Sequence, residues 1–264
     1  MKDIITKKQD HITIITINRP QVLNAFRAQT VVELTDALIS AGEDPDTRVI
    51  ILNSSIERAF TAGGDIKEEY ELDEQSAYDF AVAGKKCTQA MEENPVPVIC
   101  AVDGYALGGG LELILAADIT VAAKTAKIGI PTINLAGIPG WGSTQRLPRI
   151  VGPACAADIL LTGRILSAKE CYDLHLVQYL TEKEEMMEKA MEVAAIIADK
   201  APTAVKIMRQ ALKEGMKVSM EDALELENKL FAECYRYEDR KEGMLAFLEK
   251  RPHRKYHDRK DIFR

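Results

Sequence analysis

Two glycine segments could place backbone N–H groups against a ligand. The first reads Ala62-Gly63-Gly64-Asp65, and the second carries three successive glycines at positions 108–110. Adjacent glycines allow backbone conformations that other residues avoid, and they let a ligand approach the main chain closely. One such pair is equally typical of an ordinary turn. Two donors in separate loops favour a site that stabilises negative charge developing on an oxygen atom.

Glu112 stands close behind the second glycine segment. The segment separates an apolar run at 96–102 from a predicted helix at 111–117, and a helix N-terminus offers unpaired N–H groups and the positive end of its dipole. Because Glu112 follows Gly109 by three residues, a helix would place its carboxylate on the same face as the Gly109 N–H. An acidic residue in a first turn also simply complements the dipole. Taken with the paired glycine segments, the spacing predicts a donor and a base that converge.

The elements around these segments predict a mostly parallel sheet. Residues 11–18, 49–52 and 96–102 have the apolar and β-branched character of strands. Residues 27–41 and 74–93 carry apolar side chains at helical spacing. Strands that alternate with helices are typical of βαβ crossovers, and we therefore predict an α/β fold for this part of the chain.

The pattern changes after about Pro153, where strand signals fade and helical periodicity dominates. We therefore predict an α/β core over residues 1–200 and a helical C-terminal region over 201–264. The predicted late helices span 182–200, 202–213, 220–235 and 240–250.

Composition narrows the class of protein. A chain of 264 residues that is 47% hydrophobic can bury a sizeable core, and its net charge of −7 disfavours nucleic acid as a partner. The most apolar stretch, 107–123, is interrupted by Glu112 and Asp118, which argues against a membrane partner. Five scattered cysteines fit a reducing compartment, and the four histidines show no metal-ligand spacing. We expect a soluble cytoplasmic protein without a metal site.

Several ordered motifs resemble the enoyl-CoA hydratase/isomerase (crotonase) superfamily. The resemblance runs over nearly the whole chain, and its motifs stand in the order and at the spacing of that family. They lie at 18–20 with 23–25, 62–67, 104–112, 138–147, 161–163 and 242–250.

The resemblance implies a crotonase-like spiral of ββα units, with a helical C-terminal region that makes subunit contacts in a homotrimer or a dimer of trimers. It implies an acyl-CoA substrate and no separate cofactor, because coenzyme A is part of the substrate. The two oxyanion donors map to the N–H groups of Gly64 and Gly109. The implied reaction is the addition of water to an enoyl-CoA thioester, or its removal, through a stabilised enolate with Glu112 as the base.

The resemblance also implies a set of substrate-binding residues. Four of them, from the first glycine segment, would line the site of the adenine and pantetheine parts of CoA, and two near the C-terminus would contact CoA, often from a neighbouring subunit. Together with the oxyanion glycines, the full implied set is Ala25, Ala62, Gly64, Asp65, Ile66, Lys67, Gly109, Gly140, Phe247 and Lys250.

The chain departs from the family pattern at Thr132. Typical hydratases of the family use two glutamates, and the second follows the proline in the segment aligned here with Ile130-Pro131-Thr132-Ile133. Threonine cannot titrate near neutral pH as a carboxylic acid can. A hydratase could still work if Glu112 activates a water that also delivers the Cα proton, with Thr132 holding that water in line. On this interpretation, Thr132 joins Gly64, Gly109 and Glu112 as a catalytic residue.

Other reactions stay open at this point. An isomerase could shuttle a proton through one carboxylate, although isomerases of the family more often keep the glutamate that is missing here. A decarboxylase would need no second acid, and a non-catalytic CoA-binding scaffold would need neither. We rank hydration or dehydration first because Glu112 is retained.

Two further features have alternative interpretations. Residues 66–79 include six acidic side chains; the sequence predicts a solvated helix start, and the resemblance implies a segment that covers the acyl end of the substrate. The single tryptophan, Trp141, either lines the acyl pocket or fills the interior.

Overall fold

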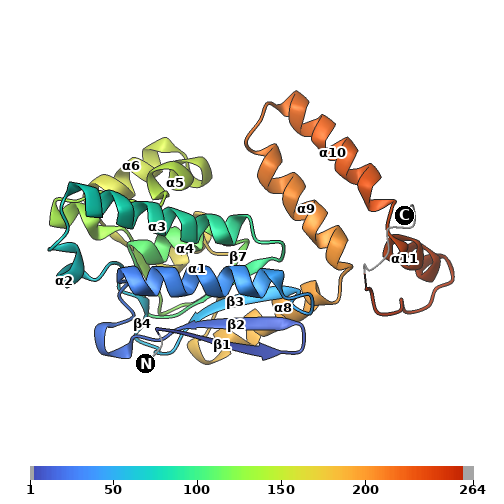
Figure 1. Ribbon diagram of the computed structural model, residues 1–264, viewed down its shortest axis with the longest axis horizontal. Helices are drawn as coiled ribbons and strands as arrows, with labels where there is room; N and C mark the ends of the chain where they lie inside the picture. Colours follow the sequence, from blue (N-terminus) through green and yellow to red (C-terminus); the bar gives the residue numbers. More distant parts are fainter. Residues whose placement is uncertain (1–2, 258–264) are drawn as a thin grey trace.

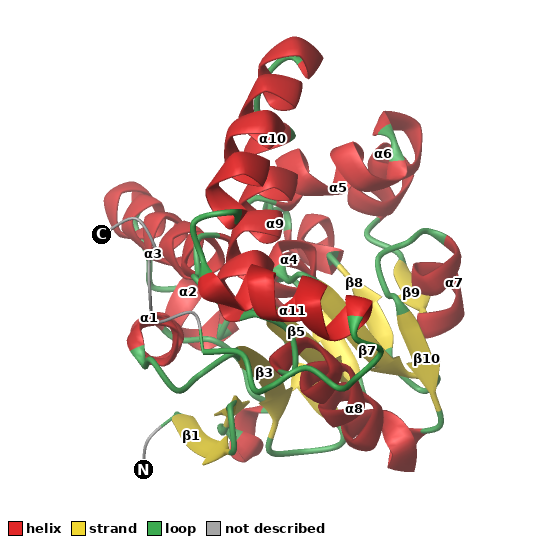
Figure 2. Cartoon of the chain, turned by 90° about the vertical axis from the view of Figure 1, so that its right-hand side faces the viewer, coloured by secondary structure: helices red, strands yellow, loops and turns green. Residues whose placement is uncertain are grey.

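The computed structural model describes residues 3–257 (Figures 1 and 2). The extreme ends of the two predicted regions, residues 1–2 and 258–264, lie outside the described residues. Within the described range the chain forms two sheets, a set of helices packed on them, and three C-terminal helices that extend to one side.

The larger sheet has six strands in the described part of the chain. Its first two strands are antiparallel and the remaining neighbours are parallel. In spatial order they are β1 (Ile4–Gln9), β2 (Ile12–Ile17), β3 (Val49–Ser54), β5 (Val98–Val102), β7 (Ile119–Ala123) and β10 (Tyr179–Thr181).

The apolar runs of this sheet are buried on both faces. Along β3, Ile50 and Leu52 belong to one hydrophobic cluster, while Val49 and Ile51 belong to another. Successive side chains of a strand point to opposite faces, so a continuous apolar run is what a sheet covered on both sides requires. Helix α8 (Met186–Ala198) covers one face, and α1 (Ala28–Glu43) and further helices cover the other.

Successive strand pairs alternate between the two sheets. The strands β3, β5 and β7 lie in the larger sheet, and their followers β4 (Ala59–Thr61), β6 (Tyr105–Leu107) and β8 (Lys127–Gly129) lie side by side in the smaller one. Helices then follow: α2 (Ile66–Glu69) and α3 (Glu74–Glu92) after β4, and α4 (Gly109–Ala116) after β6. This repetition is the ββα spiral that the resemblance implied, and the predicted fold class is confirmed.

The chain after Pro153 contains strands that the sequence did not predict. Strand β9 (Ile165–Ser167) pairs antiparallel with β8, and β10 pairs with β7. Each has three residues, too few for a period of two to be recognised, and each is fixed by a partner far away in the sequence. The intervening and flanking elements are α5 (Ser143–Val151), α6 (Pro153–Thr162), α7 (Ala168–Asp173) and the short 3-10 turns η1 (Pro20–Val22), η2 (Pro131–Leu135) and η3 (Lys183–Glu185).

Three helices form the C-terminal region: α9 (Pro202–Gly215), α10 (Met220–Cys234) and α11 (Glu238–Leu248). Helices α9 and α10 pack against each other, and both views show α10 extending away from the sheets. Arg209 of α9 is buried; its Nε lies 2.8 Å from Asp118 Oδ1, and its other nitrogens donate to the carbonyl oxygens of Met91 and Asn94. This arginine ties α9 to the core.

No helix among residues 3–257 is long and apolar enough to cross a membrane.

Candidate active site

One pocket collects the chemical groups that the sequence singled out. It has an internal volume of about 310 Å³ and is lined by the segment after β4, by α3, by the start of α4, by η2 and by the loop before α5. Seven of the predicted site residues line it: Ala62, Gly64, Ile66, Gly109, Glu112, Thr132 and Gly140.

The two glycine segments touch each other through their glycines. Gly63 and Gly108 have φ values of +95° and +52°, which L side chains rarely adopt. A Cβ atom built on Gly108 would lie 3.6 Å from the Cα of Gly63, and one on Gly63 would lie 3.0 Å from the carbonyl oxygen of Leu107. Glycine therefore lets these two loops approach to the distance at which both can contact one small group.

The N–H of Gly64 points away from its neighbouring strand segment. The Gly63 carbonyl accepts from the Phe26 N–H at 2.7 Å, and the Asp65 N–H donates to the Phe26 carbonyl at 2.8 Å. In a trans peptide the N–H of Gly64 is opposite to the Gly63 carbonyl. The Gly64 N–H is therefore directed away from Phe26, and Gly64 itself lines the pocket.

Gly109 is the first residue of α4, so its N–H has no acceptor within the helix. Among the hydrogen bonds of residues 3–257, the N–H groups of Gly64 and Gly109 have no protein acceptor. Two unpaired backbone donors on the wall of one pocket can together bind an oxygen that carries negative charge.

Glu112 lies on the same pocket and is only 3% exposed. Its Oε1 accepts hydrogen bonds from the N–H groups of Trp141 at 2.8 Å and Ser143 at 3.0 Å. Burial raises the pKa of Glu112, and these hydrogen bonds oppose the rise only in part. A carboxylate held in place by two N–H groups, with its pKa moved toward neutrality, suits the role of a general base.

Trp141 both lines the pocket and fills the interior, so both predicted alternatives hold. Its side chain is 5% exposed and packs with Phe26 and Phe80, with ring centroids 5.3 Å and 5.7 Å away, yet it also lines the pocket. A Cβ atom on Gly109 would lie 2.7 Å from the indole ring. The ring therefore fixes the position of the helix start that carries the Gly109 N–H.

Glu69 is a pocket residue that the sequence analysis did not identify. It is half-buried, and the prediction of a solvated helix start is wrong for this side chain, although Tyr70 beside it is 84% exposed. Burial raises the pKa of Glu69, and the charges of Asp65 and Glu68 add to the rise. The short helix α2 folds this residue back over Gly64, which no periodic pattern in four residues could have indicated.

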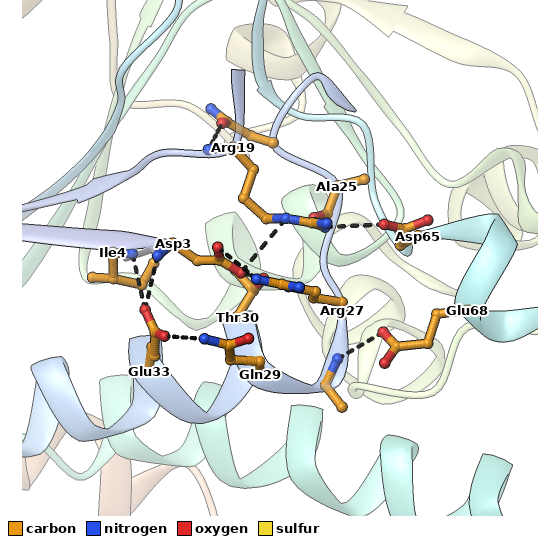
Figure 3. A network of polar contacts seen from close by, with 12 residues as sticks. Asp3, Ile4, Arg19, Ala25, Arg27, Gln29, Thr30, Glu33, Asp65 and Glu68 are labelled. Carbon is orange, nitrogen blue, oxygen red and sulfur yellow. Dashed lines mark hydrogen bonds and ion pairs between the residues drawn. The ribbon is translucent and has the colours of Figure 1, made fainter. Parts of the chain in front are cut away.

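Two other predicted site residues, Ala25 and Asp65, belong to a buried polar network instead of the pocket lining (Figure 3). Arg19 donates from Nη1 to the carbonyl oxygen of Ala25 and to Asp65 Oδ2, the latter at 3.0 Å. Its Nε lies 3.5 Å from Asp3 Oδ2. The network joins the N-terminal strand to the segment that carries Gly64, and the CoA contacts of Ala25 and Asp65 stay predictions.

The remaining predicted residues are on the surface. Lys67 is exposed in α2, Phe247 is 83% exposed in α11, and Lys250 is exposed just after that helix. Phe247 and Lys250 lie in the C-terminal region, and neither lines the described pocket of its own chain. Their contact with CoA from a neighbouring subunit stays a prediction.

Asp3 is the anionic centre of the network in Figure 3. It is 4% exposed and accepts hydrogen bonds from Arg27 Nε at 2.8 Å, Arg27 Nη2 at 3.0 Å and Thr30 Oγ1 at 2.6 Å. Burial opposes ionisation, but the hydrogen bonds from Arg27 and Thr30 outweigh it and lower the pKa of Asp3. A carboxyl group whose pKa is lower in the folded protein stabilises the fold above its unfolded pKa, and this contribution is lost as the pH falls through the folded pKa.

We expect Asp3→Asn to lower the free energy of unfolding by about 2 kcal/mol at pH 6, because it removes charge-assisted hydrogen bonds. The difference from wild type should shrink as the pH falls below about 4, where the unfolded carboxyl becomes protonated. Urea unfolding at a series of pH values measures this. Asp36→Asn, on an exposed position of α1, is the control. A difference that stays constant down to pH 3 would contradict the assigned role of Asp3.

Solved structures of other proteins have the same fold. The crystal structure of enoyl-CoA hydratase from Bacillus anthracis superposes with a TM-score of 0.93 at 36% identity, covering 97% of this chain and 99% of that one. An enoyl-CoA hydratase structure from Geobacillus kaustophilus gives 0.94 at 29% identity, with 97% of each chain covered. The arrangement of the two sheets and the helices is thus that of a crotonase-type protein.

The chain belongs to the enoyl-CoA hydratase/isomerase family, whose model matches residues 7–259. A relative named crotonyl-CoA hydratase from Syntrophomonas wolfei is 38% identical over 250 residues, covering 95% of this chain and 96% of the relative. A short-chain-enoyl-CoA hydratase from Clostridium acetobutylicum is 37% identical with the same coverage of both. The resemblance stated from the sequence motifs is confirmed, and the protein is an enzyme of this family.

Proposed function

We propose that the protein adds water reversibly to a short-chain enoyl-CoA. The observation that carries the proposal is the convergence of three groups in one pocket: the unpaired N–H groups of Gly64 and Gly109, and the buried carboxyl of Glu112. Two relatives bear the names crotonyl-CoA hydratase and short-chain-enoyl-CoA hydratase. A volume of about 310 Å³ lies at the small end of ligand pockets, which supports a short acyl group.

In this proposal the thioester carbonyl oxygen accepts hydrogen bonds from Gly64 and Gly109. Glu112 removes a proton from water while the water oxygen bonds to Cβ, and the electron pair of the double bond moves to form an enolate. The two N–H groups are worth most at this stage, because they are already directed at the oxygen where the charge develops. The product forms when Cα takes up a proton, which in the net reaction comes from the added water, and the carbonyl is restored.

Thr132 distinguishes this pocket from one with two family glutamates. It lines the pocket and can hold a water molecule by a hydrogen bond, but its hydroxyl cannot exchange a proton near neutral pH as a carboxylic acid does. We propose that Thr132 positions water, and that Glu112 supplies the titrating group on the side of Cβ.

We propose that the CoA moiety runs from this pocket toward Ala25, Ala62, Asp65, Ile66 and Lys67, with Gly140 close to the acyl end. The reaction uses no separate cofactor. We also propose a homotrimer or a dimer of trimers, in which Phe247 and Lys250 of one subunit contact CoA bound to another. The 83% exposure of Phe247 supports this, because a large apolar side chain at that position gains from burial against a second copy.

The decisive experiment is an assay with crotonyl-CoA. Hydration should remove the absorbance of the conjugated thioester, and mass analysis should find a product heavier by one water molecule. A shifted double bond without added water across a panel of enoyl-CoAs would instead indicate an isomerase. Tight CoA binding with no turnover of any acyl-CoA would indicate a scaffold. Light scattering during gel filtration measures the oligomer, and a monomeric mass would contradict the proposed assembly.

A further inference from the structure

Glu69 occupies space that exists only because residue 64 is glycine. A Cβ atom on Gly64 would lie 1.6 Å from Glu69 Oε1 and 2.6 Å from its Cδ. The carboxyl group therefore lies directly on the Cα of the residue whose N–H is one of the two unpaired donors. A larger residue at position 64 would displace this carboxyl from its present place in the pocket.

The carboxyl of Glu69 is also uncommitted. Among residues 3–257 it has no hydrogen-bond or ion-pair partner, whereas Glu68 beside it accepts from the Ala28 N–H at 2.9 Å and Asp65 pairs with Arg19. A half-buried carboxyl without a partner is costly unless a ligand or water meets it. Structural roles account for the two neighbouring acids and leave Glu69 directed into the pocket without one.

Neither Glu112, which serves Cβ in the proposed reaction, nor Thr132 supplies a titrating group for Cα. Glu112 on α4 has one oxygen fixed by the N–H groups of Trp141 and Ser143 at the start of α5, and Thr132 is neutral. In the proposed binding mode the thioester oxygen lies between Gly64 and Gly109, and Cα, two bonds away from that oxygen, lies within reach of groups next to either glycine. Glu69 rests on Gly64 itself, so its carboxyl is available on the Gly64 side.

We propose that Glu69 is the second catalytic carboxyl of this enzyme and exchanges a proton with Cα of the acyl-CoA, the task for which Thr132 has no group. This inference rests on the proposed function for the identity of the substrate. It assigns acid–base chemistry at Cα to α2, on the side of Gly64, and chemistry at Cβ to Glu112 on α4.

In the direction of hydration, the proposed step is balanced in protons and electrons. Glu112 begins as a carboxylate and Glu69 as a carboxylic acid. The water oxygen bonds to Cβ, its proton passes to Glu112, and the electron pair of the double bond forms the enolate. Glu69 then gives its proton to Cα as the carbonyl is restored. The product is a 3-hydroxyacyl-CoA, and proton exchange with solvent returns Glu112 and Glu69 to their starting forms.

The electrostatic surroundings of Glu69 disfavour its charged form. The acidic groups near it are Asp65 and Glu68 on its own segment, Asp79 from α3 in the cavity behind it, and Glu112 across the pocket. Burial, followed by Asp65 and Glu68, raises the pKa of Glu69. A raised pKa makes a carboxyl a better proton donor near neutral pH.

The test uses Glu69→Gln, which keeps the shape of the side chain and removes its titrating proton. Two reactions are measured. The first is hydration of crotonyl-CoA, and the second is exchange of the Cα protons of saturated butyryl-CoA in D₂O, which mass spectrometry detects. We expect both rates to fall by about tenfold or more, with KM changed by less than about twofold. Glu71→Gln is the matched control, because that side chain is exposed, lies outside the pocket and is not among the charges that act on Glu69, and it should leave both rates unchanged. Adding Thr132→Glu to Glu69→Gln should restore part of the lost rate.

The outcomes separate this inference from the proposed function. A wild-type enzyme that exchanges Cα protons through Glu69 but hydrates no enoyl-CoA would overturn hydration and keep the role of Glu69. Normal hydration and exchange in Glu69→Gln, or a change in KM alone, would overturn the role of Glu69 and keep hydration. A wild-type protein that does neither would overturn both.

Discussion

Replacing Glu112 with glutamine should lower kcat for the hydration of crotonyl-CoA by about 10³-fold, because a positioned general base contributes roughly 10²- to 10⁴-fold. The change removes the group that takes the proton from water. The Kd for a saturated acyl-CoA should stay within about twofold, since the oxyanion donors belong to the main chain of Gly64 and Gly109. Stopped-flow absorbance measures the rate, and isothermal titration calorimetry measures the binding.

Glutamine is a suitable replacement because the local structure needs only one oxygen from residue 112. Its amide oxygen can accept from the N–H groups of Trp141 and Ser143 as Oε1 of Glu112 does now, and the amide nitrogen can face the pocket. Glu71→Gln, at an exposed position outside the pocket, is the matched control and should retain full activity. Turnover by Glu112→Gln close to that of wild type would show that another group activates the water.

Replacing Arg209 with methionine should produce the largest loss of stability. Arg209 is 9% exposed; its Nε contacts both oxygens of Asp118 at 2.8 and 2.9 Å, and its other nitrogens donate to the carbonyls of Met91 and Asn94. Removing one partner of a buried ion pair leaves the other charge poorly compensated and typically costs about 3–5 kcal/mol. The free energy of unfolding in urea should fall by that amount.

The loss of stability in Arg209→Met should first expose the segment where α9 joins the core. Limited proteolysis should cleave the variant faster between α8 and α9, because the contacts of Arg209 fix α9 against the end of α3 and the residue that precedes β7. Lys206→Met, one turn earlier on the same helix, removes the same charge and should change stability by less than about 0.5 kcal/mol. Equal stability of the two variants would mean that Lys213, 2.9 Å from Asp118, suffices to compensate that carboxylate.

Long elements with a clear pattern could be predicted from the sequence. The run at 49–52 and the helix at 74–93 correspond to β3 and α3 within two residues at each end, because a continuous apolar run is typical of a strand buried on both faces and α3 buries side chains at helical spacing. The short strands β9 and β10 could not be predicted in this way. Their three residues carry no period, and their formation depends on partners in β8 and β7 that are distant in the sequence.

The sequence by itself determined which groups are available for chemistry: two glycine segments that can expose main-chain donors, Glu112 at a fixed helical offset, and a neutral Thr132. These follow from residue type and from spacing of a few residues, which local geometry fixes. Only the tertiary structure decided which groups meet. It brought Glu69 onto Gly64, directed Asp65 toward Arg19, and made Trp141 both core and pocket wall. Those contacts depend on how α2, α4 and the loop before α5 pack against one another, and packing between distant segments leaves no periodic trace in the sequence.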